Sequence, residues 1–100
     1  MNDRELLELA AKAAGYKLMP SLPHDDGLRL YTANQIGYIK WNPLTDDGDA
    51  LRLAVKLGFM VNFRKKTVVY ACFPNRDFVE DGCYRRAIVR AAAEIGAKNV

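Results

Sequence analysis

Three stretches of the chain place apolar residues at the three-to-four-residue spacing of an amphipathic helix. The first covers residues 4–14, the second residues 50–57 and the third residues 84–95. A glycine follows each stretch, where helices commonly end in the left-handed conformation. The pattern therefore predicts three helices, each ending at its glycine. Asn2 or Asp3 is the expected N-cap of the first helix.

Four shorter stretches are rich in the aliphatic, β-branched and aromatic residues that favour strands. Residues 28–32 and 36–41 are separated by three residues, which predicts a β-hairpin. Residues 59–63 and 67–73 flank a charged turn and are predicted to form a second antiparallel pair. The last of these strands is apolar on both faces, which is typical of a strand that is covered on both sides.

The segments between these elements are rich in proline, glycine and polar residues. Residues 16–27 are predicted to be a loop with a short extended piece near residues 17–19, and residues 74–82 a polar loop. The resulting order is α-β-β-α-β-β-α, and no repeated β-α-β crossover pattern is present. We therefore expect an α+β fold in which three helices pack on a four-stranded, mainly antiparallel sheet.

Size and composition are those of one small domain that spans residues 1–100. Half of the 100 residues are apolar, which is enough for one continuous core. No apolar run approaches the ~18 residues that a membrane span requires, and no secretory pattern precedes the first helix, so we expect a cytoplasmic protein with no membrane partner. Two cysteines and one histidine provide neither a disulfide framework nor the spacing of a zinc site. No metal or other cofactor is predicted.

Charge is divided unevenly along the chain. Residues 1–50 carry five Lys or Arg against eight Asp or Glu, a net charge of −3, whereas residues 51–100 carry ten against four, a net charge of +6. Such a split can mark a surface for an anionic partner, and it can equally be two solvated faces. The candidate surface for a protein partner or a nucleic acid consists of Arg64, Lys65, Lys66, Arg76, Arg85, Arg86 and Arg90.

A second group of residues lies between the predicted second strand and second helix. The strand ends at Trp41, Asn42 and Pro43. A tryptophan at the end of a strand either packs into the core or forms an exposed aromatic surface for binding, and we favour packing into the core. Asp46, Asp47 and Asp49 follow. Their spacing does not match a calcium loop, and acids at the start of a helix satisfy its free amides, so we interpret them as capping residues rather than as a Mg²⁺ or Ca²⁺ site.

Catalytic chemistry has little support in the sequence. His24 beside two aspartates could serve as a general base, and Cys83 precedes a helix whose N-terminus would lower the pKa of a thiol. Nothing in the spacing pairs these two residues. Cys72 lies among apolar residues and is expected to be buried. The glycine patterns of the common phosphate-binding loops are also missing from the sequence.

Three blocks of the chain resemble the phage ABA sandwich domain family, small proteins of tailed phages and prophages. They are residues 4–15, residues 85–96 and, most specifically, residues 41–58, which read WNPLTDDGDALRLAVKLG. The resemblance implies an α/β/α sandwich with helices on both faces of a sheet, and a phage origin. It implies no established activity and so transfers no catalytic residues. Residues 16–40 and 59–84 do not take part, and residues 81–84 depart from the family's pattern.

Three classes of function follow from these observations. The first is a non-enzymatic phage accessory protein that binds a host or phage protein. The second is a nucleic-acid-binding accessory protein that uses the basic C-terminal half. A small enzyme is the third, and a homodimer formed through exposed edge strands is open in each case.

Overall fold

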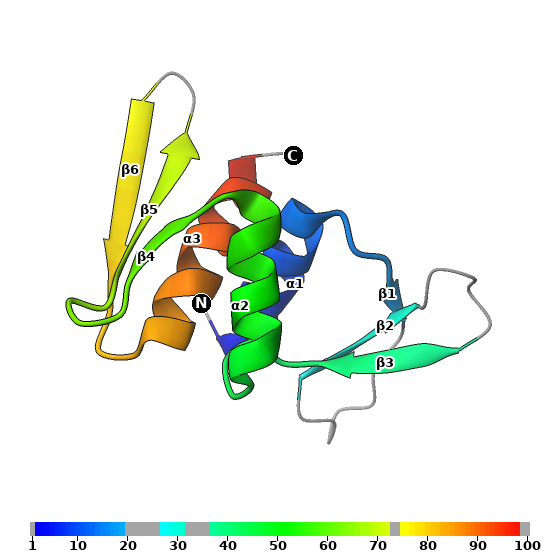
Figure 1. The fold of residues 1–100 in the computed structure, drawn as a ribbon. Helices are drawn as coiled ribbons and strands as arrows, with labels where there is room; N and C mark the ends of the chain where they lie inside the picture. Colours follow the sequence, from blue (N-terminus) through cyan, green and yellow to red (C-terminus); the bar gives the residue numbers. More distant parts are fainter. Residues whose placement is uncertain (1, 20–26, 32–36, 73–74, 99–100) are drawn as a thin grey trace.

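The computed structural model describes residues 2–19, 27–31, 37–72 and 75–98. Within these residues the chain forms three helices and two separate three-stranded antiparallel sheets. Figure 1 shows the helices lying between the two sheets. In chain order the elements are α1 (Asp3–Ala14), β1 (Leu18–Met19), β2 (Leu28–Tyr31), β3 (Tyr38–Trp41), α2 (Asp47–Leu57), β4 (Met60–Asn62), β5 (Thr67–Cys72), β6 (Asn75–Glu80) and α3 (Tyr84–Lys98).

The expected α+β class is confirmed, but the single four-stranded sheet is wrong. Both predicted hairpins form, with Leu28 opposite Trp41 in one and Val61 opposite Val68 in the other. Each hairpin belongs to its own sheet, and a different third strand completes each one: β1 joins β2 and β3, and β6 joins β4 and β5. Strand β1 comes from the short extended piece expected near residues 17–19 and pairs with β2.

Strand β6 lies in a segment that we predicted to be a loop. It pairs with β5 along its whole length, from Thr67 opposite Glu80 to Cys72 opposite Asn75. Of its residues 77–80, Val79 is the one that is buried, and Phe78 is exposed. An edge strand with one buried position carries too weak an apolar alternation to be recognised from sequence.

The ends of α1 and α2 follow the local sequence signals. The side chain of Asn2 accepts a hydrogen bond from the amide of Glu5 (2.8 Å), and that of Asp46 accepts one from the amide of Asp49 (2.8 Å). Gly15 and Gly58 end the two helices in the left-handed conformation, with φ of 75° and 70°. These caps satisfy amides and carbonyls that have no partner within the helix.

Helix α3 does not end at Gly96 as predicted but continues to Lys98. A Cβ atom at position 96 would overlap the backbone carbonyl of Leu9 on α1. Gly96 therefore permits the two helices to approach closely, and it is not a C-cap. Around this contact both helices present small residues that are fully buried: Ala10, Ala11, Ala91 and Ala92.

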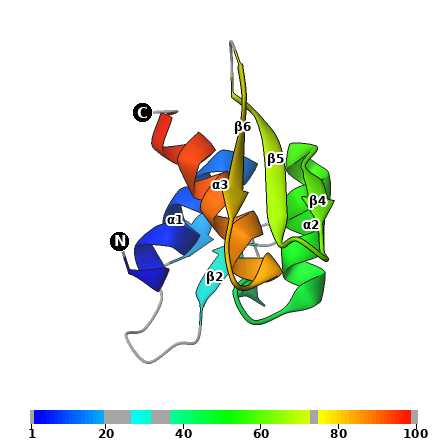
Figure 2. The same cartoon turned by 90° about the vertical axis from the view of Figure 1, so that its left-hand side faces the viewer.

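Each sheet turns one face toward the helices, as Figure 2 shows for β5 and β6 against α3. Val68, Tyr70 and Val79 lie on the covered face and are buried. On the opposite face Met60 pairs with Val69, and Val69 with Phe78; Met60 and Phe78 are 65% and 63% exposed. In the described part of the chain, helices thus cover one face of this sheet. The expectation that β5 is covered on both sides is therefore wrong. The expected sandwich, with helices on both faces of one sheet, is also wrong, because the helices lie between two sheets.

Candidate functional site

The three aspartates before and within the first turn of α2 have different partners. Asp46 caps the helix, and the carboxylate of Asp49 accepts a hydrogen bond from the amide of Asn42 (3.0 Å) and pairs with Arg52 (2.7 Å). Asp47 instead contacts Tyr84 and Arg85 on α3. Within residues 2–19, 27–31, 37–72 and 75–98, no group of three or more His, Cys, Asp or Glu side chains is arranged to hold a metal ion.

The turn that leads into α2 is built into the core. Trp41 is 4% exposed and meets the ring of Tyr16 edge to face, with 5.5 Å between the ring centroids. Pro43 is fully buried. The side chain of Asn42 accepts a hydrogen bond from the amide of Leu44 (3.1 Å), and its carbonyl accepts one from the amide of Asp46 (2.9 Å). This segment fixes where α2 begins and offers no exposed tryptophan platform.

The predicted basic residues fall into two groups with different surroundings. The arginines of α3 are each paired with a carboxylate: Arg85 with Asp47 (2.6 Å), and both Arg86 and Arg90 with Asp81 (3.9 and 3.0 Å). Arg86 also pairs with Asp3 (3.0 Å). The structure thus brings Arg86 and Arg90 together around one shared acid, Asp81, while Arg85 contacts Asp47.

The turn between β4 and β5 carries the second group. Arg64, Lys65 and Lys66 are all exposed, and none of them forms an ion pair with another described residue. Arg76 is in β6, and its side chain lies outside the described part of the chain. Of the predicted basic residues whose side chains the structure describes, those of the turn are the ones that form no ion pair with another described residue.

The starts of α2 and α3 are joined by a polar cluster of Asp47, Tyr84 and Arg85. The Tyr84 hydroxyl donates to the Asp47 carboxylate (2.5 Å), and the Arg85 guanidinium donates to the same oxygen (2.6 Å) and to the Leu44 carbonyl (3.2 Å). The Tyr84 hydroxyl and the Arg85 guanidinium lower the pKa of Asp47, and the Asp47 hydrogen bond raises the pKa of Tyr84. The cluster fixes the starts of α2 and α3 relative to each other. Its polar groups form hydrogen bonds with one another and with the Leu44 carbonyl.

Beside this cluster the surface is hollow and apolar. A cavity of about 390 Å³ is lined by Asp47, Ala50, Leu51, Phe63, Tyr84 and Ile88. The ring of Phe63 packs edge to face on Tyr84, 5.3 Å between centroids. Ile88 and Ala50 are each 1% exposed, whereas Leu51 and Phe63 are 52% and 51% exposed. The inner wall is thus core, and the outer wall consists of large side chains open to solvent.

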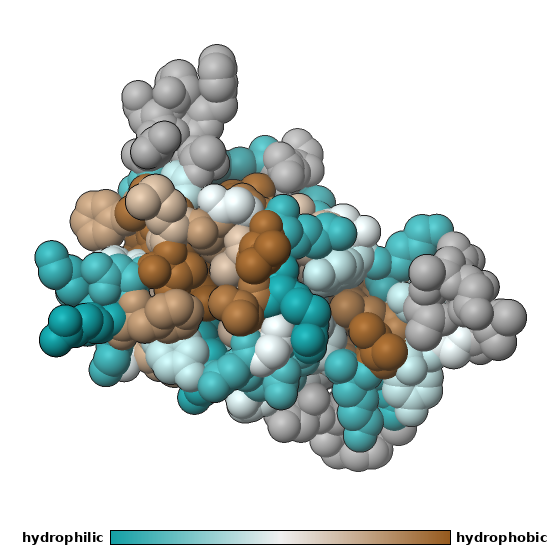
Figure 3. Space-filling view, viewed as in Figure 1, coloured by the Kyte–Doolittle hydropathy of each residue, from teal (hydrophilic) through white to brown (hydrophobic). Residues whose placement is uncertain are grey.

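A second hollow adjoins the first at Leu51. Its volume is about 360 Å³, and Val55, which is 74% exposed, lines it together with Arg52 and Lys56. The Lys56 ammonium lies 5.0 Å from the centroid of the Tyr16 ring. We call Leu51, Val55 and Phe63 the apolar face. Figure 3 shows hydrophobic residues gathered on this side of the molecule, over α2 and the neighbouring strands.

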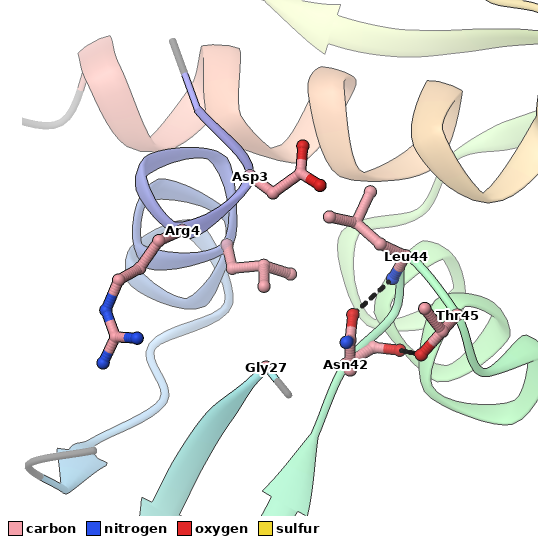
Figure 4. Close-up of a pocket in the computed structure, with 7 residues that line it drawn as sticks. Asp3, Arg4, Gly27, Asn42, Leu44 and Thr45 are labelled. Carbon is pink, nitrogen blue, oxygen red and sulfur yellow. Dashed lines mark hydrogen bonds between the residues drawn. The ribbon is translucent and has the colours of Figure 1, made fainter. Parts of the chain in front are cut away.

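Another cavity, of about 240 Å³, lies between the start of α1 and the turn before α2 (Figure 4). Its polar side chains already have partners. Asp3 pairs with Arg86 and Arg4 with Glu8 (3.7 Å), and the side chain of Asn42 is bound by the Leu44 amide. The close-up also shows Arg4 directed away from Leu44. This cavity is a weaker candidate because its polar groups are used within the fold.

Of His24, Cys72 and Cys83, which were considered for their possible chemistry, the structure describes the side chain of Cys83. Cys83 is half-buried, and its amide donates to the Asp81 carboxylate (3.2 Å) just before α3 begins. His24 and the side chain of Cys72 lie outside the described residues.

Sequence reasoning missed the apolar face, although one signal for it is present. Residues 50–57 are apolar on more than one side of the helix, since Leu51 and Val55 are added to the stripe of Ala50, Leu53 and Ala54. A helix apolar on several sides is either fully buried or part of an interface. Phe63 gave no such signal, because its position beside Tyr84 depends on the tertiary structure.

Comparisons with protein-family models, curated proteins and solved structures found no match to this chain. None of the helices in the described residues is long and apolar enough to cross a membrane.

Proposed function

We propose that this protein is a non-enzymatic binding module that recognises another protein through its apolar face. The observation that carries the proposal is the exposure of Leu51 and Phe63, 52% and 51%, at the rim of a cavity whose inner wall is core, with Val55, 74% exposed, in the adjoining hollow. Isolated exposed apolar residues are common, but adjoining ones that rim a cavity are typical of interaction sites.

The proposed cellular setting rests on the sequence blocks at residues 4–15, 41–58 and 85–96. Their resemblance to phage ABA sandwich proteins supports a phage- or prophage-encoded accessory protein that acts in the host cytoplasm. The partner is then a host or phage protein. A small domain with an exposed apolar face can bind such a protein without chemistry of its own.

A nucleic-acid-binding accessory protein is the second candidate, and the cations of Arg64, Lys65 and Lys66 favour it. Phosphate binding depends on unpaired Lys and Arg charges. It is the weaker proposal because the arginines of α3, which were to complete such a surface, are paired with Asp47, Asp3 and Asp81. A small enzyme ranks last: the Tyr84 hydroxyl does lie beside the Asp47 carboxylate, but both groups are held by Arg85 in the contact between α2 and α3.

The test is affinity purification of the tagged protein from phage-infected host cells, with and without nuclease, for the wild type, Val55→Asp and Ile39→Asp. Ile39 is a matched control because it is an exposed aliphatic residue (53%) on β3, in the other sheet. We expect a stoichiometric protein partner that survives nuclease, is lost with Val55→Asp and is retained with Ile39→Asp.

Two results would contradict the proposal. One is recovery of the same proteins with all three variants, which would separate binding from the apolar face. The other is recovery dominated by nucleic acid and abolished by nuclease, which would favour the second candidate.

A further inference from the structure

The charges around the apolar face indicate what kind of protein segment it binds. Resting on the function proposed above, we infer that the apolar face takes an acidic amphipathic segment of the partner, whose apolar side chain enters the cavity beside Phe63 while its carboxylates meet Arg64, Lys65 and Lys66.

The cavity itself selects an apolar side chain. Ala50 and Ile88 form its inner wall, and Leu51 and Phe63 its rim. Asp47 is the one charged residue among those that line it, and its carboxylate is engaged by Tyr84 and Arg85. An aliphatic or aromatic side chain that fills the cavity removes apolar surface from water on both partners, and such anchors dominate binding energy.

The cations stand at a fixed place beside this cavity. Arg64 follows Phe63 directly, and the side chain of Asn62 accepts hydrogen bonds from the amides of Arg64 (3.1 Å) and Lys65 (3.0 Å). Lys66 has a positive φ of 55°, and its carbonyl accepts a hydrogen bond from the amide of Asp81 (3.2 Å). The turn is thus held at both ends, and it directly follows Phe63 on the cavity rim.

These charges differ from the other cations of the basic half. Arg52, Arg85, Arg86 and Arg90 are paired with carboxylates. Arg64, Lys65 and Lys66 form no ion pair with the residues that the structure describes, so a carboxylate of a partner does not have to displace an internal one. Lys56, on the other side of Leu51, adds a further positive charge at the adjoining hollow, where its ammonium lies over the ring of Tyr16.

The combination favours an acidic protein segment over a nucleic acid. A phosphate backbone would meet the turn but would leave the cavity and the apolar face unfilled. A helix or extended strand that alternates apolar anchors with Asp or Glu satisfies both, in the way that amphipathic segments fill apolar grooves. Opposite charges at the rim chiefly raise the rate of association and exclude the wrong partners.

The experiment selects a displayed random-peptide library on the immobilised wild-type protein and measures the affinity of the enriched peptides by fluorescence anisotropy. We expect enriched sequences that contain large apolar residues and more Asp and Glu than Lys and Arg. Raising the salt concentration from about 0.05 M to about 0.5 M should weaken their binding, because it screens exposed charges.

Variants separate the contribution of the apolar anchor from that of the positive charges. Phe63→Ser and the double variant Arg64→Glu/Lys65→Glu should each weaken binding by at least about tenfold, since one removes an anchor and the other reverses the rim charge. Phe78→Ser is the matched control, because Phe78 is equally large and exposed (63%) but lies on β6; it should leave affinity within about twofold. Circular dichroism checks that each variant is folded.

The outcomes separate this inference from the function on which it rests. Enriched peptides that depend on Phe63 but carry no excess of acids would overturn the acidic partner and leave the binding module standing. Binding that is indifferent to Phe63→Ser would overturn both. Equal affinity for a single-stranded DNA oligonucleotide, lost in the double variant, would overturn the acidic segment in favour of a phosphate backbone.

Discussion

The helical core and the apolar face contain the same kinds of residue but differ in what covers them. Leu51 and Leu53 stand two positions apart on α2; Leu53 is fully buried, whereas Leu51 is 52% exposed. Helical geometry places neighbours two apart on different sides of the helix, and tertiary packing decides which side is covered. Leucine on α2 is therefore a core residue at one position and an exposed surface residue at the other.

The two regions also differ in the size of their side chains. Where α1 meets α3, small residues let the backbones approach until Gly96 lies against the carbonyl of Leu9. On the apolar face the side chains are large, and two of them, Leu51 and Phe63, form the rim of an open hollow of about 390 Å³. The small residues at the contact between α1 and α3 are already fully buried. A partner that fills the open hollow would remove apolar surface from water, which favours binding.

The largest difference is expected between alanine variants of the two leucines of α2. Leu53→Ala should lower the free energy of unfolding by about 2–5 kcal/mol because it leaves a cavity in the core. Leu51→Ala should change it by no more than about 0.5 kcal/mol because this side chain is half exposed. Urea unfolding followed by circular dichroism measures both. Equal losses for the two variants would show that Leu51 belongs to the core.

Two glycine-to-alanine variants test whether α1 and α3 approach each other as closely as the structure shows. Gly96→Ala should destabilise the protein by about 1–3 kcal/mol, since its methyl group overlaps the Leu9 backbone and the helices must move apart. Gly82→Ala is the control, because a Cβ atom there meets nothing within 4 Å. Thermal unfolding of the two variants compares them directly. If Gly96→Ala unfolds at the wild-type temperature, the close contact is not a feature of the protein.

The smallest effect concerns the polar cluster at the edge of the apolar face. The pKa of Asp47 is lowered in the folded state by Tyr84 and Arg85, so its stabilising contribution is present at neutral pH and is lost as the pH falls below about 4 and through the folded value. Asp47→Asn should therefore have a lower Tm than the wild type near neutral pH. The difference should shrink toward acid.

Thermal unfolding at a series of pH values measures this difference, with Glu94→Gln as a control at an exposed carboxylate on α3. A constant gap in Tm between wild type and Asp47→Asn across the acid range would mean that the charge on Asp47 does not contribute to the contact between α2 and α3.

Much of the local structure could be predicted from the sequence because its causes are local. Asn2, Asp46, Gly15 and Gly58 cap helices through atoms within a few residues of each other. The two hairpins follow from short apolar strands around short turns. Gly96 has the same local appearance as the other two glycines, and it was misassigned because its reason lies on another helix.

The candidate site was far less predictable. The seven basic residues looked alike in sequence, yet Arg85 meets an aspartate 38 positions away, whereas Arg64, Lys65 and Lys66 meet none among the described residues. Phe63 reaches Tyr84 across 21 positions of chain. Such partners depend on how the elements pack, and apolar periodicity carries no information about them.

The sequence by itself determined the α+β class, the three helices with two of their C-caps, and the two hairpins, because hydrogen bonds and side-chain periodicity within a few residues set these features. The tertiary structure alone decided that the hairpins enter two sheets, that α3 runs past Gly96, and which apolar and basic residues stay exposed. These outcomes depend on contacts between distant segments, where burial of one face leaves another open to a partner.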